Sequence, residues 1–195
     1  MTVTGAPEKT DHDTYFRSEL GRLRVLLKRR VLWLRHQWHH SPARDAIDGV
    51  ISDRHADWLL SAEDRGAEQR FYMEHAAAQE LTAQAAVLQK EADRLRKRLG
   101  PKQALPIDVL CHVFGLGVFE RNVLLLCAAP EFDPGFQALF GYVQDNVKAD
   151  YPTMHLAYAL FGTPQTYVRQ LSAYFSANAP LRRYRLLQVR ELAAP

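Results

Sequence analysis

The chain has 195 residues, of which 47% are hydrophobic and 24% are charged, enough for one core with an extension but short for two full domains. Its formal net charge of +3 is too small to make nucleic-acid binding the default interpretation. The N-terminus lacks the pattern of a signal peptide, and the apolar runs are far shorter than the ~20 residues of a membrane span. We therefore expect a cytoplasmic protein without a membrane span.

The first part of the chain is predicted to be a tail followed by a long helix. Residues 1–12 are polar and show no apolar period, so we expect a disordered tail. From residue 13 onward no proline interrupts the chain before Pro42. Apolar side chains recur there mostly at steps of three and four, as in a helix: Phe16, Leu20, Leu23, Leu27, Leu34 and Trp38.

A second long helix is predicted over about residues 67–99, after a short corner. Gly100 and Pro101 are expected to end it. At about 1.5 Å per residue it would be roughly 50 Å long, so we expect it to project as an arm. Its apolar positions alternate steps of four and three, which is a heptad seam where alanines let a partner helix approach closely: Leu81, Ala85, Leu88, Ala92, Leu95 and Leu99.

This seam requires a partner helix. The first long helix lies upstream and returns through a short corner, which favours an antiparallel hairpin within one chain. The alternative is the same helix of a second copy, which would make the chain a homo-oligomer. Loop closure costs less than association, so we favour the intramolecular hairpin and assign residues 13–104 to it.

Residues 105–195 are predicted to form a compact domain. Short helices are expected near residues 107–114, 119–130, 132–143, 154–161 and 164–175, and a strand over residues 184–189. Several short helices followed by a strand is the order of a winged-helix domain. The predicted fold class is therefore mainly α, with a long antiparallel, coiled-coil-like helical arm followed by a winged-helix-like domain with little β structure.

Three segments carry a resemblance to a known family. They are residues 119–131 (FERNVLLLCAAPE), the Tyr151-Pro152-Thr153 run before an apolar helix, and residues 180–187 (PLRRYRLL). As a set they resemble the N-terminal winged-helix region of the AAA+ ATPases found with extracellular contractile injection systems, the phage-tail-like particles. The resemblance covers about residues 105–192 and is weaker over the arm.

The resemblance implies a non-catalytic interaction or regulatory module, which positions an attached AAA+ motor on protein partners of the particle. ATP and Mg²⁺ are expected only in a following ATPase domain, because this sequence contains no G-x-x-x-x-G-K-[ST] segment. We therefore expect no enzymatic activity and no cofactor in this chain. The sequence ends at Pro195, after the expected first wing strand, so we expect a fragment or a shortened relative whose returning strand is absent or comes from elsewhere.

Three groups of side chains have a candidate chemistry that competes with a structural explanation. His36, His39 and His40 have helical spacing for a divalent metal, but exposed histidines near a helix end are commoner. Cys111 and Cys127 are expected to be small core residues. No nucleophile motif organises the remaining histidines and carboxylates. We therefore predict no catalytic, cofactor-binding or metal-binding residues.

Basic residues make up the candidate interaction surface. The alternative function, a nucleic-acid-binding winged helix, rests on the arginines beside the expected wing. However, the helix that would enter a DNA groove, residues 153–161, has no Lys or Arg, which favours contact with protein. The residues assigned to the interaction surface are Arg94 and Arg98 on the arm, and Arg182, Arg183 and Arg185 beside the wing.

Overall fold

The computed structural model describes residues 8–40, 57, 66–99, 104–162 and 173–190 of the chain. All regular structure within these ranges is helical, which confirms the mainly α fold class. None of these helices combines the length and the apolar character that a membrane-spanning segment needs. In chain order they are α1 (Glu8–His40), α3 (Ala67–Glu74), α4 (Ala76–Leu99), α5 (Pro106–Phe114), α6 (Val118–Phe132), α7 (Gly135–Val143), α8 (Met154–Phe161) and α10 (Pro180–Arg183).

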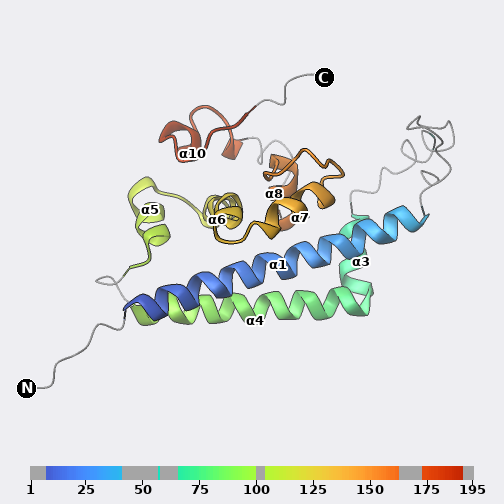
Figure 1. Ribbon diagram of the computed structural model, residues 1–195, viewed down its shortest axis with the longest axis horizontal. Coiled ribbons are helices and arrows are strands. Elements are labelled where there is room, and N and C mark those ends of the chain that lie inside the picture. Colours follow the sequence, from blue (N-terminus) through green and yellow to red (C-terminus); the bar gives the residue numbers. More distant parts are fainter. Residues whose placement is uncertain (1–7, 41–56, 58–65, 100–103, 163–172, 191–195) are drawn as a thin grey trace, which may run out of the picture.

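Helices α1 and α4 form the expected antiparallel hairpin within one chain (Figure 1). The heptad seam of α4 is its buried face, with Leu88 half-buried and the other five positions buried. Small residues bring the two helices together, since Ser18 Oγ donates a hydrogen bond to the Leu88 carbonyl at 3.2 Å. A Cβ placed on Gly21 would lie 3.7 Å from Leu88 Cδ1. The seam prediction and the intramolecular pairing are confirmed.

The ends of the hairpin differ from the expectation at two points. The first helix begins at Glu8, so residues 8–12, expected in the tail, are helical. Arg98 Nη2 donates to Asp11 Oδ1 at 2.8 Å, which pairs the start of α1 with the end of α4. The second helix is interrupted at His75, whose backbone is extended at φ −86° and ψ 117°. This break lets α3 turn across the hairpin, where Phe71 and Tyr72 pack around Trp33 in a small separate cluster.

The hairpin does not project away from the rest of the molecule. Helix α1 contacts α4 on one side and α6, α7 and α8 on the other (Figure 1). Helix α6 packs above α1, and its apolar residues Val123, Leu125, Leu126 and Ala129 are buried. Phe136 and Phe140 of α7 have no exposed surface. A single core therefore joins the hairpin to the later helices, while the domain boundary at residues 104 and 105 stays a prediction.

The strand expected over residues 184–189 is not formed. Arg185 has a left-handed backbone (φ 56°), and the amides of Leu186 and Leu187 both donate to the Leu181 carbonyl, at 2.9 and 3.0 Å. These bonds turn the chain back onto α10. Residues 184–187 therefore form a turn instead of the start of a strand. The expected helix over residues 164–175 and the corner before the second long helix lie mostly outside the described residues.

Candidate functional site

A buried polar network fixes α6 on α1. Glu19 has no exposed surface, and its carboxylate accepts hydrogen bonds from Arg22 Nε and from Arg121 Nη2, both at 2.8 Å. Arg22 Nη2 also donates to Asn122 Oδ1 at 2.8 Å. The Tyr15 hydroxyl donates to Glu19 at 3.1 Å and lies against Arg121 as well. Residues about a hundred positions apart are thus joined by charge-assisted hydrogen bonds.

The electrostatics of this network reflect its burial. Burial raises the pKa of the Glu19 carboxyl above its usual value, and the adjacent Arg22 opposes that shift. Burial lowers the pKa of Arg121 to about 10, so that its guanidinium stays charged at neutral pH. Asp108 of α5 lies 3.5 Å from Arg121 Nε and accepts from Arg96 Nε at 2.8 Å. The network therefore links α1, α4, α5 and α6, and its role is structural.

An exposed apolar surface lies on α5 and the start of α6, and we name it the α5 patch. It consists of Val109, Leu110 and Val113 of α5 together with Val118 of α6, whose exposed fractions run from 38% to 77%. Ile107 is the one buried residue of α5. Exposed large apolar residues that lie together are typical of surfaces that contact another protein.

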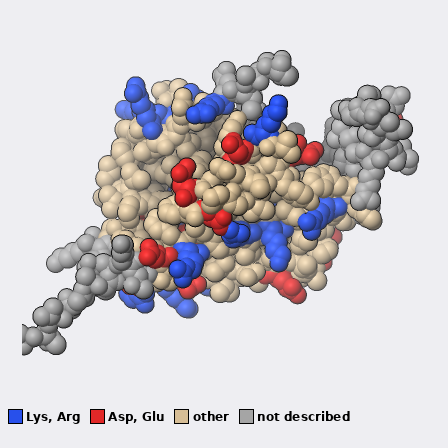
Figure 2. Space-filling view, in the orientation of Figure 1, with Lys and Arg blue, Asp and Glu red and all other residues tan. Residues whose placement is uncertain are grey.

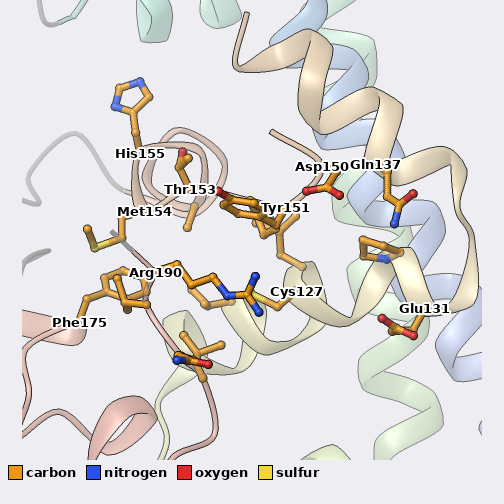
Figure 3. A pocket seen from close by; sticks show the side chains of 18 residues that line it. Cys127, Glu131, Gln137, Asp150, Tyr151, Thr153, Met154, His155, Phe175 and Arg190 are labelled. Carbon is orange, nitrogen blue, oxygen red and sulfur yellow. The ribbon is translucent and has the colours of Figure 1, made fainter. Parts of the chain in front are cut away.

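A groove of about 870 Å³ lies between the second half of α6, the start of α8 and the C-terminal segment Leu187–Arg190 (Figure 3). We name it the α6–α8 groove. Apolar side chains line much of it: Val123, Leu126, Pro130, Phe175, Leu187 and Val189. Thr153 sets the start of α8, because its side chain accepts from the Leu156 amide at 3.2 Å and caps the helix. This cap confirms the helix start predicted from the sequence.

The two ends of the groove differ in chemistry. Asp150 and Glu131 lie at one end, and Met154 and Phe175 at the other, with Arg190 between them (Figure 3). Both carboxylates are exposed, and neither forms an ion pair with another described residue. The groove therefore presents an apolar end and an acidic end.

The two cysteines are placed differently from the prediction that both are core residues. Cys111 is half-buried, whereas Cys127 is exposed and lines the groove. The exposure arises because Cys127 lies on the side of α6 that faces away from α1. Desolvation by the surrounding groove walls raises the pKa of the Cys127 thiol to about 11, so it remains protonated at neutral pH.

The predicted arginine surface divides between two sides of the molecule. Arg94 and Arg98 lie on α4, on the opposite side of α1 from α10 (Figure 1). Arg182, Arg183 and Arg185 are exposed at α10 and the turn after it. Three of the five contact another described residue: Arg98 pairs with Asp11, Arg182 Nη1 donates to the Phe175 carbonyl at 3.0 Å, and the Arg183 guanidinium lies 5.6 Å from the centroid of the Tyr184 ring. A role of these five residues in binding stays a prediction.

The remaining candidates from the sequence form no cluster in the described part of the chain. His36 and His39 are exposed, and the His36 ring packs 4.8 Å from the Phe71 ring. No three His, Cys, Asp or Glu side chains of the described residues come together as a metal site. On the face drawn in Figure 2, Lys and Arg are interspersed with Asp and Glu instead of gathering in one large basic patch.

Sequence reasoning missed the network, the α5 patch and the groove. One feature of the sequence could have predicted the network, since Glu19 and Arg22 lie at helical spacing inside an apolar stretch. Another could have predicted the α5 patch, because helix 106–114 is more apolar than one buried face requires. No feature of the sequence could have predicted the groove, because its walls come from three separate parts of the chain.

Comparison with known proteins identifies the family. A family model described as "Winged helix domain, variant" matches residues 10–194. No curated protein and no solved structure matches the chain. The match begins within α1 and includes α4 as well as the later helices, so it covers nearly the whole sequence. The chain belongs to the variant winged-helix domain family.

Proposed function

We propose that the chain is a non-catalytic interaction module of an AAA+ ATPase, which positions the motor on protein partners of a contractile injection system. Three short segments support this assignment through their resemblance to the N-terminal regions of those ATPases. Two of them lie on α6 and around α10, and the third contains the cap of α8. Winged-helix membership agrees with an interaction module and leaves the partner open.

The α5 patch is the observation that carries the proposal toward a protein partner. Val113 and Val118 expose 64% and 77% of their surface. Covering a side chain of that size contributes roughly 1.5–3 kcal/mol. Nucleic acid offers no comparable apolar surface, because phosphates dominate its contacts with proteins. Helix α8 agrees, since it exposes Met154 and His155 and contains no Lys or Arg.

Co-sedimentation with contractile particles of the same organism tests the proposal, with the full ATPase in parallel. We expect the chain to sediment with one of them, and Val109→Asp with Val113→Asp to weaken this binding at least about tenfold. The matched control is Val87→Asp with Val147→Asp, because these valines are as exposed as the patch valines or more so. Absence of wild-type binding, or equal loss in both variants, contradicts the proposal. Hydrolysis of ATP by the chain above a buffer blank contradicts its non-catalytic part.

Nucleic-acid binding is the second candidate function, favoured by the three exposed arginines at α10. Anisotropy of labelled duplex DNA over a salt series separates the two functions. We expect weak binding that fades steeply with salt and shows little sequence preference. A sequence-selective complex that survives physiological salt, and that Arg182→Gln with Arg183→Gln abolishes, would instead support the nucleic-acid function.

A further inference from the structure

We propose that the α6–α8 groove binds an extended peptide segment of a protein partner, with apolar side chains at the Met154 end and a Lys or Arg at the acidic end. The inference deepens the proposed function and rests on it for the class of partner. It concerns a surface distinct from the α5 patch.

The backbone along one wall of the groove is open to pairing. No backbone hydrogen bond joins residues 188–190 to another described residue. Exposure alternates along this segment, with Leu187 and Val189 half-buried and Gln188 and Arg190 exposed. Such alternation is typical of an extended strand with one side against a core. An incoming extended chain can therefore add beside it by main-chain hydrogen bonds, as in other cases of strand addition.

The side chains of the groove define the pattern of the peptide. Met154, which is 44% exposed, offers an apolar surface at one end beside the buried ring of Phe175, and a Val, Ile or Leu of the peptide can be covered there. Glu131 and Asp150 are unpaired carboxylates at the other end, where a cation is electrostatically complementary. Arg190 lies between the two ends and disfavours a second cation in the middle of the peptide (Figure 3). Peptide residues two positions apart share one face of a strand, so apolar residues should alternate with polar ones.

Fluorescence anisotropy of the full 195-residue chain with a labelled synthetic peptide tests this binding. The probe alternates valine with serine and ends in two lysines, and a second probe has glutamates in place of the lysines. We expect saturable binding of the lysine probe, at least about tenfold tighter than binding of the glutamate probe. Equal affinity for the two probes overturns the inference.

Charge reversal tests the acidic end. The double variant Glu131→Lys with Asp150→Lys should bind the lysine probe at least about tenfold more weakly than the wild-type chain does. The matched control is Glu74→Lys with Glu80→Lys, which changes the net charge equally at exposed positions on α3 and α4. Equal weakening in both double variants shows non-specific attraction and overturns the inference. Circular dichroism of each variant checks that the helices remain.

The strand addition has its own test. Successive amides of an extended segment point to opposite edges, and proline has no amide hydrogen. Of Gln188→Pro and Val189→Pro, one should therefore lose binding about tenfold or more and the other should keep it. Hydrogen exchange should show new protection of amides in residues 188–190 when the peptide binds. Two unaffected proline variants with no new protection overturn the pairing, as does peptide-independent dimerisation of the chain through this segment.

These outcomes separate the inference from the proposed function. If the chain binds the lysine probe but neither the particle nor the ATPase, the inference about the groove stands and the proposed function is wrong. If the chain sediments with the particle but does not bind the lysine probe, the proposed function stands and the inference about the groove is wrong.

Discussion

Helix α1 makes two contacts that differ in chemistry: a regular apolar seam toward α4, and a contact toward α6 that includes buried charges. Toward α4, leucines and alanines of a regular seam pack against small residues such as Ser18 and Gly21. Toward α6, buried charges meet, with Glu19 between Arg22 and Arg121. The first contact is non-directional and gains free energy from the apolar area that it removes from water. The second contact depends on geometry, because each buried charge must be paired.

The stability of the hairpin and the position of α6 therefore depend on different sides of α1. Leucine burial at the seam supplies much of the free energy that holds the hairpin together. A buried ion pair contributes little net stability relative to well-packed apolar residues. It disfavours misplacement, since a shift of α6 along α1 would leave Glu19 or Arg121 unpaired in the core. We therefore interpret the seam as the source of stability and the network as the device that fixes the later helices in place.

The seam gives the largest expected effect. Leu88→Asp with Leu95→Asp removes the burial of Leu95 and the partial burial of Leu88, together up to about 6 kcal/mol, and adds the cost of a carboxylate at the buried Leu95 position. Because α1 also carries α6, α7 and α8, we expect the whole chain to unfold with the hairpin. Urea unfolding followed by far-UV and near-UV circular dichroism measures this. Val87→Asp on the same helix is the control, since Val87 is 64% exposed. Later helices that stay folded would contradict the shared core and favour a separate arm.

The network gives the next effect. Glu19→Ala leaves two buried guanidinium groups without their shared carboxylate and should lower the free energy of unfolding by about 3–5 kcal/mol. Glu19→Gln keeps an acceptor oxygen and should cost less. Chemical denaturation of both variants is the measurement, with the exposed Glu80→Ala as a control expected within about 0.5 kcal/mol of wild type. If Glu19→Ala behaves like the control, the network has no positioning role.

Overpacking of the seam has a smaller effect. Ala92 has no exposed surface, so Ala92→Leu must push α1 and α4 apart and should cost about 1–3 kcal/mol. The matched change at Ala86, which is exposed on the same helix, should be close to neutral. Thermal unfolding of the two variants compares them directly. A neutral Ala92→Leu would mean that the helices are less closely packed than the structure shows.

The smallest effect has the opposite sign. Gly21 lies in the middle of α1, and its added Cβ would meet Leu88 at an ordinary contact distance of 3.7 Å. Gly21→Ala should therefore raise the free energy of unfolding by about 0.5–1 kcal/mol, because alanine loses less backbone entropy on folding. Denaturant midpoints at equal m-value measure this gain. A loss of stability would show that the helices require the bare backbone at this position.

The hairpin could be predicted because its signal is periodic and local. Leu81, Leu88 and Leu95 recur at heptad spacing, and a short connection makes the preceding helix the nearest partner. The helices after residue 105 were predicted for similar reasons, from apolar runs bounded by proline, glycine and a threonine cap. The interruption at His75 escaped prediction because no proline or glycine marks it.

The network and the groove depend on contacts that the sequence does not express locally. Arg121 reads as a charge at the exposed start of a helix, and its pairing with Glu19 joins residues 102 positions apart. The strand expected over residues 184–189 was wrong for a related reason. Its alternating side chains suit a strand, but the left-handed Arg185 and the bonds to Leu181 turn the chain before a partner strand is met. Tertiary context outweighed local propensity.

The sparse burial of α5 has a consequence for its dynamics. A helix of nine residues is not stable in water by itself, and Ile107 is the one residue of α5 that is buried; the Asp108 carboxylate and the Phe114 ring, 4.8 Å from the Tyr184 ring, add further contacts. Few buried apolar contacts mean a small opening free energy, so α5 should detach and reform while α1, α4 and α6 stay in place. Its amides should then exchange with solvent much faster than those of α6. A partner that covers the α5 patch would slow the hydrogen exchange of the α5 amides selectively. The exchange rate of α5 would therefore report whether a partner is bound.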